Sequence, residues 1–341
     1  MQGVFYCRAQ EERMDILVTG SVAYDYLMTF PGYFKEHLLA EHLEKISLSF
    51  LVETLVRRRG GIAPNIAYTL ALLGGRPRVL ATVGEDFEEY RSWLEEQGVD
   101  TLNVKVVPGK YTASYFATTD KSNAQVASFY PGAMAHAAEL SLHELAGARP
   151  DLVVISPNEP AAMEMYVREC AELALPYVYD PSQQIIRFEG EVLRRGVEGA
   201  HALFVNAYEF ELIKDKTKMT VDDLMSHLHF MVVTLGPDGA AVYFNGGQQT
   251  VEAVPTDHIQ DPTGGGDAFR GGFLTGYRLG LDWDTCARLG SLAATYCLEN
   301  EGPQAHHFTL EDFLVRYRQF YDDAGKLDIL LLNKHSSVAT D

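Results

Sequence analysis

The sequence has few cysteines, few basic residues and no long apolar run, and each shortage excludes a class of protein. Its four cysteines show neither C-x-x-C nor disulfide-framework spacing, which predicts buried thiols in a reducing cytoplasm. The 28 lysines and arginines stand against 47 aspartates and glutamates, and the net charge of -19 leaves no basic stripe for nucleic acid or an anionic membrane. No apolar run reaches the ~18 residues that would span a bilayer. We therefore expect a cytoplasmic protein without a nucleic-acid or membrane partner.

Strand-like and helix-like patterns alternate over most of the 341 residues. Such alternation predicts an α/β protein with a mostly parallel central sheet and helices on both faces. The length allows one large domain or two ordinary ones, and the hydrophobic content of 47% is enough for a sizeable core. Residues 1–14 contain charges and no apolar core, which predicts an N-terminal extension and not a signal peptide.

One region departs from the alternation. Residues 102–107, 111–118 and 124–130 form three strand-like pieces without helices between them. They predict an antiparallel insert, a small sheet lying over a binding site. Tyr115 and Phe129 in this insert are core residues of the small sheet by default, and the alternative is that they stack on a flat base.

The segment Asp261-Pro-Thr-Gly-Gly-Gly-Asp-Ala-Phe269 is the most informative in the chain. Its glycines, Gly264, Gly265 and Gly266, lie where a loop becomes a helix, and free N–H groups at a helix start suit a phosphate. Asp267 then falls in the first helical turn, where a carboxylate could take a proton from an alcohol as a general base. The alternative is that Asp267 offsets the helix dipole and the glycines only form a turn. The segment is neither a P-loop nor a dinucleotide fingerprint.

Further polar residues follow predicted strands or open helices. Ser21 and Asp25 lie after the strand at 15–19, at the sheet edge where α/β proteins bind ligands. Gly61 would let a ligand approach the backbone, and Asn65 precedes a helix predicted for 66–73. Capping and turn formation are the alternative roles. The run Arg57–Arg59 reads by default as a solvated face.

Two segments in the second half carry similar signals. Asn206 and Glu209 follow a strand at 202–205, and a carboxylate combined with water and substrate phosphates suits Mg²⁺. Alone the pattern is weak, because Glu209 could be an ordinary first-turn carboxylate. The segment from Thr234 through Gly236 to Gly239 follows another strand and turns back into a hairpin.

The glycine segment resembles the D-x-T-G-x-G-D signature of the ribokinase-like (PfkB) family of small-molecule kinases. The Gly-Gly pair with Asn65, the N-x-x-E of 206–209 and the T-x-G-x-x-G of 234–239 resemble further family motifs in the same order. Segments 30–32, 47–52, 127–134, 180–184 and 261–276 look like those of the bacterial adenosine kinases of this family. The chain departs from many sugar kinases at Ile62-Ala63-Pro64, where those have a further glycine.

The resemblance implies a single kinase domain over 15–325, a lid built from about 24–59 and 103–131, and a C-terminal tail at 326–341. It implies transfer of phosphate from ATP, with Mg²⁺, to the 5′-hydroxyl of adenosine, with Asp267 as base and the three glycines around the phosphoryl group. A monovalent cation such as K⁺ near Asp261 and Thr263, and a homodimer formed through the lids, follow by the same analogy. Another nucleoside or a sugar such as ribose or fructose is the alternative substrate, and a non-catalytic nucleoside-binding regulator is the alternative of another class. The substrate residues implied are Ser21, Asp25, Ser49, Gly61, Asn65, Tyr115, Phe129, Gln183 and Gln184; the nucleotide residues are Asn206, Thr234, Gly236, Gly239 and Thr263; Glu209 would hold Mg²⁺, directly or through water.

Overall fold

A nine-stranded sheet forms the centre of the molecule in the computed structural model, which describes residues 14–37 and 48–332. Its strand order is β13-β12-β11-β10-β9-β8-β1-β4-β5, and every neighbouring pair from β11 to β5 is parallel. The hairpin β12–β13 adds two antiparallel strands at one edge. These strands are β1 (Ile16–Thr19), β4 (Arg78–Val83), β5 (Asp100–Val106), β8 (Leu152–Ile155), β9 (Tyr177–Tyr179), β10 (Ala202–Asn206), β11 (Phe230–Thr234), β12 (Ala240–Phe244) and β13 (Gly247–Val251).

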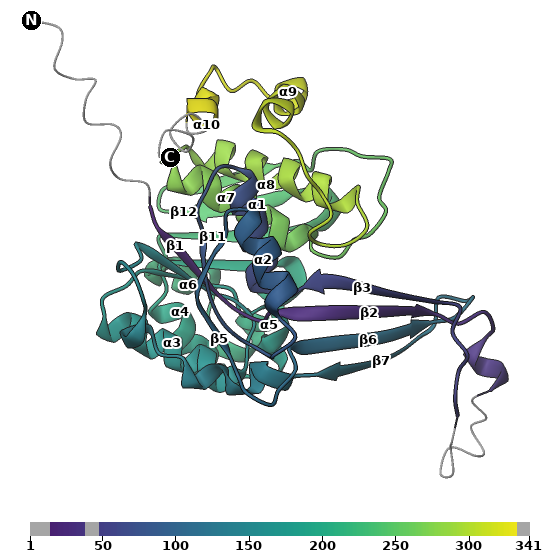
Figure 1. Cartoon of the computed structure of the whole chain (residues 1–341). Helices are drawn as coiled ribbons and strands as arrows, with labels where there is room; N and C mark the ends of the chain where they lie inside the picture. The colour runs from purple at the N-terminus through teal and green to yellow at the C-terminus, as the bar shows by residue number, and fades with distance from the viewer. Residues whose placement is uncertain (1–13, 38–47, 333–341) are drawn as a thin grey trace, which may run out of the picture.

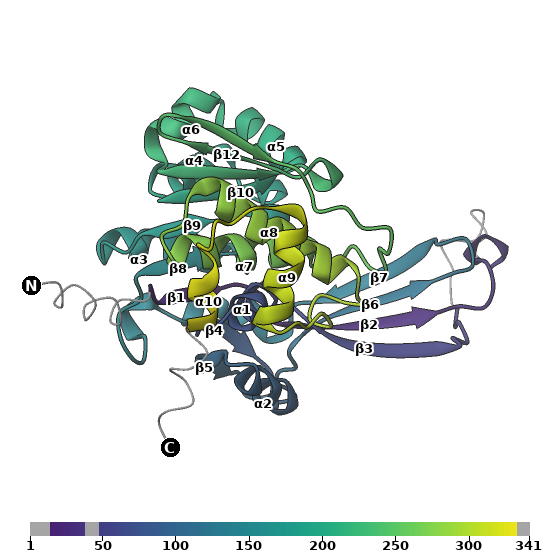
Figure 2. The same ribbon diagram turned by 90° about the horizontal axis from the view of Figure 1, so that it is seen from above.

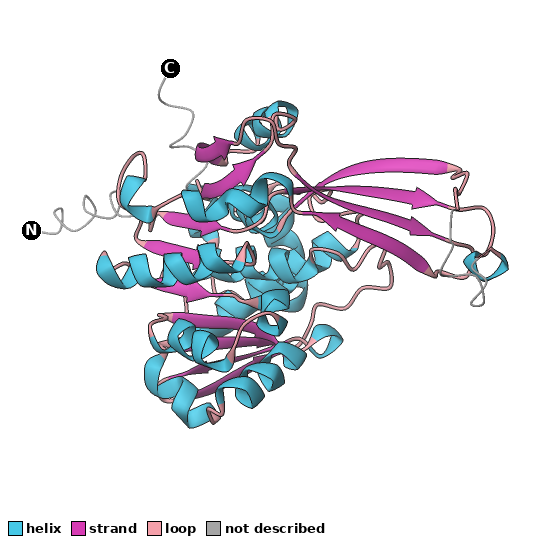
Figure 3. Cartoon of the chain, turned by 90° about the horizontal axis from the view of Figure 1, so that it is seen from below, coloured by secondary structure: helices cyan, strands magenta, loops and turns pink. Residues whose placement is uncertain are grey.

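Helices cover both faces of this sheet, as Figures 1 and 3 show. Alternation along each strand divides the core in two: Val18 of β1 packs with the α1 and α7 side, and its neighbour Leu17 packs with the α3 and α4 side. The predicted fold class is therefore confirmed. The helices of the first face are α1 (Ile62–Leu72), α2 (Glu88–Glu96), α7 (Gly265–Arg278) and α8 (Trp283–Leu298), followed by α9 (Leu310–Phe320) and α10 (Asp328–Leu332); those of the second are α3 (Pro160–Glu172), α4 (Gly190–Glu198), α5 (Ala207–Thr217) and α6 (Val221–His227).

A separate four-stranded sheet, which we call the lid, projects away from the body (Figures 1 and 2). Its order is β3-β2-β6-β7, with β2 parallel to β6 and the outer pairs antiparallel. Its strands are β2 (Ala23–Thr29), β3 (Thr54–Gly60), β6 (Ala113–Thr119) and β7 (Gln125–Tyr130).

Some sequence expectations need correction at this level. The piece at 102–107 is β5, which pairs in parallel with β4 in the main sheet and is not part of the lid, because its inward residues meet α2 and β4. The lid is also not wholly antiparallel, since β2 and β6 run the same way. Helix α1 begins at Ile62, four residues earlier than predicted, because Pro64 is accommodated inside its first turn. Most of the N-terminal extension, and the end of the predicted tail, lie outside the described residues.

Candidate active site

A cavity of about 280 Å³ opens where the parallel strands end at their carboxyl side. Asn206 ends β10, Thr234 ends β11, and Ser182 follows β9, so three neighbouring strands each deliver one polar residue to it. The N-terminus of α7 forms the opposite wall. The lining residues are Ile62, Ser182, Gln183, Asn206, Glu209, Thr234, Gly264, Gly266, Asp267 and Arg270.

The glycine segment forms the tight entry into α7. Gly264 caps the helix in the left-handed region, with φ of 83°, and the helix begins at Gly265, so Asp267 lies in its first turn as predicted. No side chain caps this end of α7, so its first N–H groups are left for another acceptor. Gly266 faces the cavity, and a Cβ there would lie 3.0 Å from Nη1 of Arg270.

Asp267 lies in the first turn of α7 and is mostly shielded from solvent. Asn65 Nδ2 donates to Asp267 Oδ2 at 2.8 Å, and Arg270 Nη1 lies 4.0 Å from Asp267 Oδ1. Burial raises the pKa of Asp267, and the Arg270 charge and the Asn65 hydrogen bond oppose that rise. The carboxylate is thus partly desolvated, yet it accepts one hydrogen bond from Asn65 and lies near the Arg270 charge, which suits a group that must accept a proton.

Arg270, one turn along α7, is held by a buried partner. Its Nη2 lies 2.7 Å from Oδ1 of Asp180, which follows β9 and is fully buried. Burial raises the pKa of Asp180 to about 7, and Arg270 opposes the rise. The pair fixes the guanidinium beside Asp267, and sequence reasoning missed it because 90 residues separate the partners.

Asn206 and Glu209 form a reciprocal capping box at the start of α5. Asn206 Oδ1 accepts from Glu209 N, and Glu209 Oε2 accepts from Asn206 N, both at 2.8 Å. Ser182 Oγ donates to Glu209 Oε1 at 3.0 Å. Each oxygen of Glu209 therefore already accepts one hydrogen bond while the residue lines the cavity. This arrangement fits a metal ion reached through water better than one bound by a freely turning carboxylate.

Thr234 pairs in register with Asn206 across β10 and β11, which brings the two predicted nucleotide motifs side by side. Gly236 and Gly239 then form the turn into β12, with φ of 62° and 94°. A Cβ at Gly239 would lie 2.0 Å from the carbonyl oxygen of Val251, so only glycine fits there. Neither glycine lines the cavity described above.

The N-terminal elements meet the same site from the other side. Ser21 Oγ accepts from Ile62 N at 3.3 Å, which joins the β1 loop to the start of α1. Gly61 has φ of 96°, and a Cβ there would lie 2.5 Å from the Ser21 carbonyl oxygen. The close approach at Gly61 thus serves packing between these two segments.

Asp25 lies within lid strand β2 and not in the loop after β1, which corrects its predicted place. Extended backbone continues through this residue because β2 pairs on both sides, with β3 and β6. Asp25 stands opposite Tyr115, and Tyr115 stands opposite Phe129, so the three side chains share one face of the lid. Burial raises the pKa of Asp25 to about 6, and Arg58 opposes that rise.

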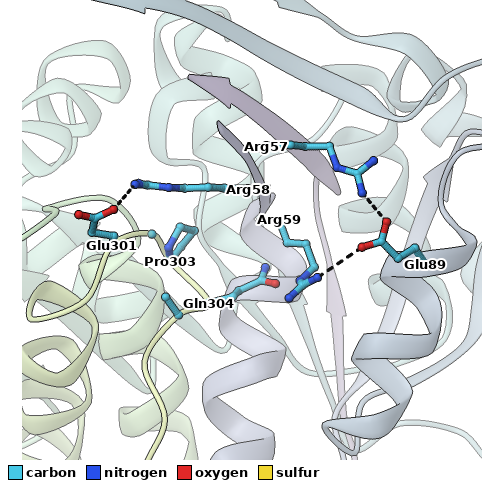
Figure 4. A pocket seen from close by; sticks show the side chains of 9 residues that line it. Arg57, Arg58, Arg59, Glu89, Glu301, Pro303 and Gln304 are labelled. Atoms are coloured by element: carbon cyan, nitrogen blue, oxygen red, sulfur yellow. Dashed lines mark hydrogen bonds and ion pairs between the residues drawn. The ribbon is translucent and has the colours of Figure 1, made fainter. Parts of the chain in front are cut away.

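The run Arg57–Arg59 is not a simple solvated face. Its three side chains line a second cavity of about 220 Å³ between the lid and the body (Figure 4). Arg57 and Arg59 point toward Glu89, while Arg58 pairs with Asp261 at 2.6 Å and with Glu301 at 2.9 Å. The pairs form because successive side chains of β3 point to opposite faces, where Glu89 lies on one side and Asp261 and Glu301 lie on the other.

The remaining predicted residues have varied surroundings. Thr263 is exposed, and its N–H donates to Asp261 Oδ1 at 2.9 Å; with Arg58 on Oδ2, both oxygens of Asp261 have partners. Gln183 lines the first cavity, whereas Gln184 is buried and accepts from Arg187 at 3.4 Å. Ser49 is exposed, and no interaction in the described part of the chain connects it to the cavity.

Residues 14–37 and 48–332 contain neither a metal-binding cluster nor a membrane-spanning helix. No cluster of three or more histidine, cysteine or acidic side chains is arranged to hold a metal, and no helix is both long and apolar enough to cross a membrane. Cys170, Cys286 and Cys297 are buried free thiols, as predicted, and Cys7 lies outside these residues.

A model of the pfkB family of carbohydrate kinases matches residues 19–308. The nucleoside kinase of Methanothermobacter thermautotrophicus is 30% identical over 304 residues, which cover 86% of this chain and 93% of that protein. The resemblance stated from the sequence is therefore confirmed at the level of the family.

Solved structures agree with this assignment. The nucleoside kinase of Burkholderia thailandensis in complex with inosine has a TM-score of 0.80 and 36% identity, covering 90% of this chain and 98% of that one. The same protein in complex with ADP-inosine has a TM-score of 0.78. The adenosine kinase of Sinorhizobium meliloti shares the fold at 22% identity, with a TM-score of 0.69 over 91% of this chain and 100% of that one. The chain belongs to the pfkB family of carbohydrate kinases.

Proposed function

We propose that this protein is a nucleoside kinase that transfers the γ-phosphoryl group of ATP to the 5′-hydroxyl of adenosine. The observation that carries the proposal is the row Asp25–Tyr115–Phe129 on one face of the lid. A carboxylate next to two aromatic rings suits a vicinal diol attached to a flat base, whereas a free sugar gives the rings nothing to stack on. The 30% and 36% identity to nucleoside kinases supports the same substrate class.

Asp25 would accept hydrogen bonds from the 2′ and 3′ hydroxyls and so fix the ribose. Ser21, Gly61 and Asn65 would complete the ribose site from the body. Tyr115 and Phe129 would contact the base, with Gln183 and Gln184 nearby on the segment after β9 and Ser49 reaching the site from a neighbouring subunit.

Asp267 would take the proton of the 5′-hydroxyl as its oxygen attacks the γ-phosphorus. The new bond joins the 5′ oxygen to phosphorus, the bond to the bridging oxygen of ADP breaks, and the products are AMP and ADP. The N–H groups from Gly264 to Asp267, which no side chain caps, would stabilise the developing phosphoryl charge, an electrostatic effect that is usually the largest in such reactions. Closure of the lid would exclude water, which would otherwise accept the phosphoryl group.

The nucleotide would bind along Asn206, Thr234, Gly236, Gly239 and Thr263. Glu209 would hold Mg²⁺ through water, because both its oxygens already accept hydrogen bonds. When bound, Mg²⁺ neutralises phosphate oxygens. A monovalent cation such as K⁺ near Asp261 and Thr263 would share the Asp261 carboxylate with the Arg58 guanidinium.

The lid also supports a homodimer. Large apolar side chains are exposed on three of its four strands, β3, β6 and β7, and exposed apolar surface on a projecting sheet favours pairing between copies. These side chains are Leu55, Val56, Phe116, Val126, Phe129 and Tyr130.

The experiment that tests the proposal measures ADP release with Mg·ATP and a panel of adenosine, inosine, guanosine, cytidine, ribose and fructose. Preference for adenosine supports the full proposal. Preference for inosine, the ligand named for the Burkholderia structure, or for another nucleoside would support a nucleoside kinase and replace adenosine as its substrate. Turnover only with a free sugar contradicts the aromatic base site, and adenosine binding without any turnover would favour a nucleoside-binding regulator.

A further inference from the structure

Four hydrogen bonds lead from Asp267 to the base of the lid. Asn65 Nδ2 donates to Asp267 Oδ2 at 2.8 Å, and Asn65 Oδ1 accepts from Gln304 Nε2 at 2.6 Å. Gln304 Nε2 also donates to the Tyr90 oxygen at 2.5 Å, and the Tyr90 hydroxyl donates to the Gly60 carbonyl at 3.0 Å. The chain joins α7, α1, the loop after α8, α2 and the last residue of lid strand β3, and we call it the amide relay.

The two ends of the amide relay determine its direction. The Gly60 carbonyl can only accept, and so can Asp267 when it is ionised. The Tyr90 proton must therefore go to Gly60, which leaves the Tyr90 oxygen as an acceptor for Gln304. The amide NH₂ of Gln304 then faces Asn65, and the NH₂ of Asn65 faces Asp267. Each bond has one donor and one acceptor.

Protonation of Asp267 would weaken the first bond of this chain. With the proton on Oδ1, Oδ2 would still accept from Asn65, but as the oxygen of a neutral acid. A hydrogen bond to a charged acceptor is stronger than one to a neutral acceptor. With the proton on Oδ2, its hydroxyl would donate to Asn65 only after the Asn65 and Gln304 amides had both turned. The observed orientation of the relay therefore favours the ionised carboxylate.

The relay is buried, and it leaves one buried oxygen atom without a hydrogen bond. Asn65, Tyr90 and Gln304 are 5%, 0% and 8% exposed, and Gln304 lies on the wall of the second cavity (Figure 4). In the observed orientation the Gln304 Oε1 atom is buried without a hydrogen-bond partner. An unpaired buried oxygen is unfavourable. The amide keeps this orientation because the opposite one would set its oxygen against Asn65 Oδ1.

We propose that Gln304 and Tyr90 are positioning residues that hold the Asn65 NH₂ group toward Asp267 and so keep this carboxylate in its proton-accepting form. The proposal concerns two residues that do not line the cavity containing Asp267, and its catalytic consequence rests on the proposed kinase function. Because the relay ends on Gly60, the last residue of lid strand β3, it also connects the orientation of the Asp267 carboxylate to the position of the lid.

The other titratable groups around Asp267 are not members of the relay. They are Arg270 on the same helix, Glu209 at the start of α5, Asp180 after β9 and the Cys297 thiol on α8. A change in the titration of Asp267 in a Gln304 or Tyr90 variant therefore reports on the relay.

The test uses the full chain with Gln304→Leu and Tyr90→Phe, and Tyr68→Phe as the matched control. The Tyr68 hydroxyl is also buried and donates at 2.6 Å to the His306 carbonyl in the same loop, but no hydrogen bond connects it to Asn65. The first readout needs no activity: the pKa of the Asp267 carboxyl, followed by ¹³C NMR on aspartate-labelled protein and assigned by its absence in Asp267→Asn.

We expect the pKa of Asp267 to rise by about 1 in Gln304→Leu, which is the scale of losing one orienting hydrogen bond, by less in Tyr90→Phe, and not at all in Tyr68→Phe. In the second readout, the acidic limb of kcat against pH moves to higher pH in the same order. At a pH well below the pKa of Asp267 in both proteins, the Gln304→Leu enzyme then loses about 10-fold more turnover than at pH 9, since a rise of 1 in pKa there lowers the ionised fraction about tenfold.

Unchanged titration of Asp267 in both relay variants overturns the inference, whatever the enzyme phosphorylates. If Gln304→Leu does not fold, Tyr90→Phe alone decides, because it removes a single oxygen. A wild-type protein that phosphorylates no nucleoside contradicts the proposed function instead. The NMR titration of Asp267 still decides whether the relay holds its carboxylate.

Discussion

Gly264 and Pro303 are packed so closely that a Cβ added to Gly264 would lie 2.3 Å from the Cβ of Pro303. Gly264 caps α7 with a positive φ, and Pro303 lies in the loop that follows α8. Through this contact the segment 264–266 packs against the loop that contains Gln304. Glycine at this position therefore serves both the turn and the packing behind it.

Gly264→Ala should destabilise the fold more than Gly246→Ala. Both glycines have positive φ, 83° and 109°, so each alanine carries a backbone cost of about 1–2 kcal/mol. Only Gly264 adds a clash, worth about 1–3 kcal/mol, since nothing lies within 4 Å of a Cβ at Gly246. Denaturant unfolding of the two variants measures the difference. Equal free energies of unfolding would show that Pro303 moves aside for the added Cβ at little cost in stability.

Asp267→Asn should lower turnover by about 10²–10⁴ and leave the dissociation constant for adenosine within a few-fold, because the residue acts on the proton and not on binding. Asp284→Asn is the matched control, since Asp284 also lies in a first helical turn and pairs with an arginine, Arg288, at 2.9 Å. Steady-state kinetics and calorimetric binding give both numbers. Equal, small losses in the two variants would reduce Asp267 to a helix-dipole role.

Adenosine binding should weaken as the pH falls below about 6. Burial raises the pKa of Asp25 to about 6, and the ionised carboxylate accepts hydrogen bonds from both ribose hydroxyls with its two oxygens. The dissociation constant should therefore rise up to tenfold per pH unit below 6 and stay level above it. For stability the sign is opposite: the folded state favours the neutral form, so this contribution is present below pH 4 and is lost as the pH rises through 6.

Calorimetric titrations between pH 5 and pH 8 measure this dependence. Asp25→Asn serves as the control, with weak binding that no longer changes near pH 6. A dissociation constant that is flat over this range in the wild type would remove Asp25 from the ribose site.

Leu55→Asp should convert a dimer to a monomer if the lids pair. Leu55 lies on outer lid strand β3 with 63% of its surface exposed, and a buried charge at an interface is strongly unfavourable. Leu102→Asp is the control, because Leu102 is 66% exposed on β5 in the body. Light scattering after size exclusion reports the mass of each. A monomeric wild type, or dimers in all three proteins, contradicts pairing through this face of the lid.

Local pattern was enough for several features. Alternating strands and helices predicted the parallel sheet, because each strand buried on both faces is a short apolar run. Glycines before an apolar helical stretch predicted a helix start with free N–H groups, and α7 begins there. The N-x-x-E spacing brings Asn206 and Glu209 together, because residues three apart at a helix start are neighbours.

The local sequence pattern could not predict which distant strands pair with one another. The piece at 102–107 has the composition of a lid strand, yet β4 offers it a parallel partner in the main sheet. Asp25 looked like a loop residue, yet β3 and β6 pair with it from both sides. Hydrogen-bond partners of a strand come from anywhere in the chain, so only the folded sheet selects them.

By itself, therefore, the sequence determined the α/β class, the family motifs and the residues that end strands or open helices, since these depend on neighbours within one or two turns. Only the tertiary structure decided which polar groups meet. The pair Arg270–Asp180 joins residues 90 apart, and the bond between Gln304 and Asn65 joins residues 239 apart. Buried polar groups need partners, and the fold provides them from whichever segments it packs together.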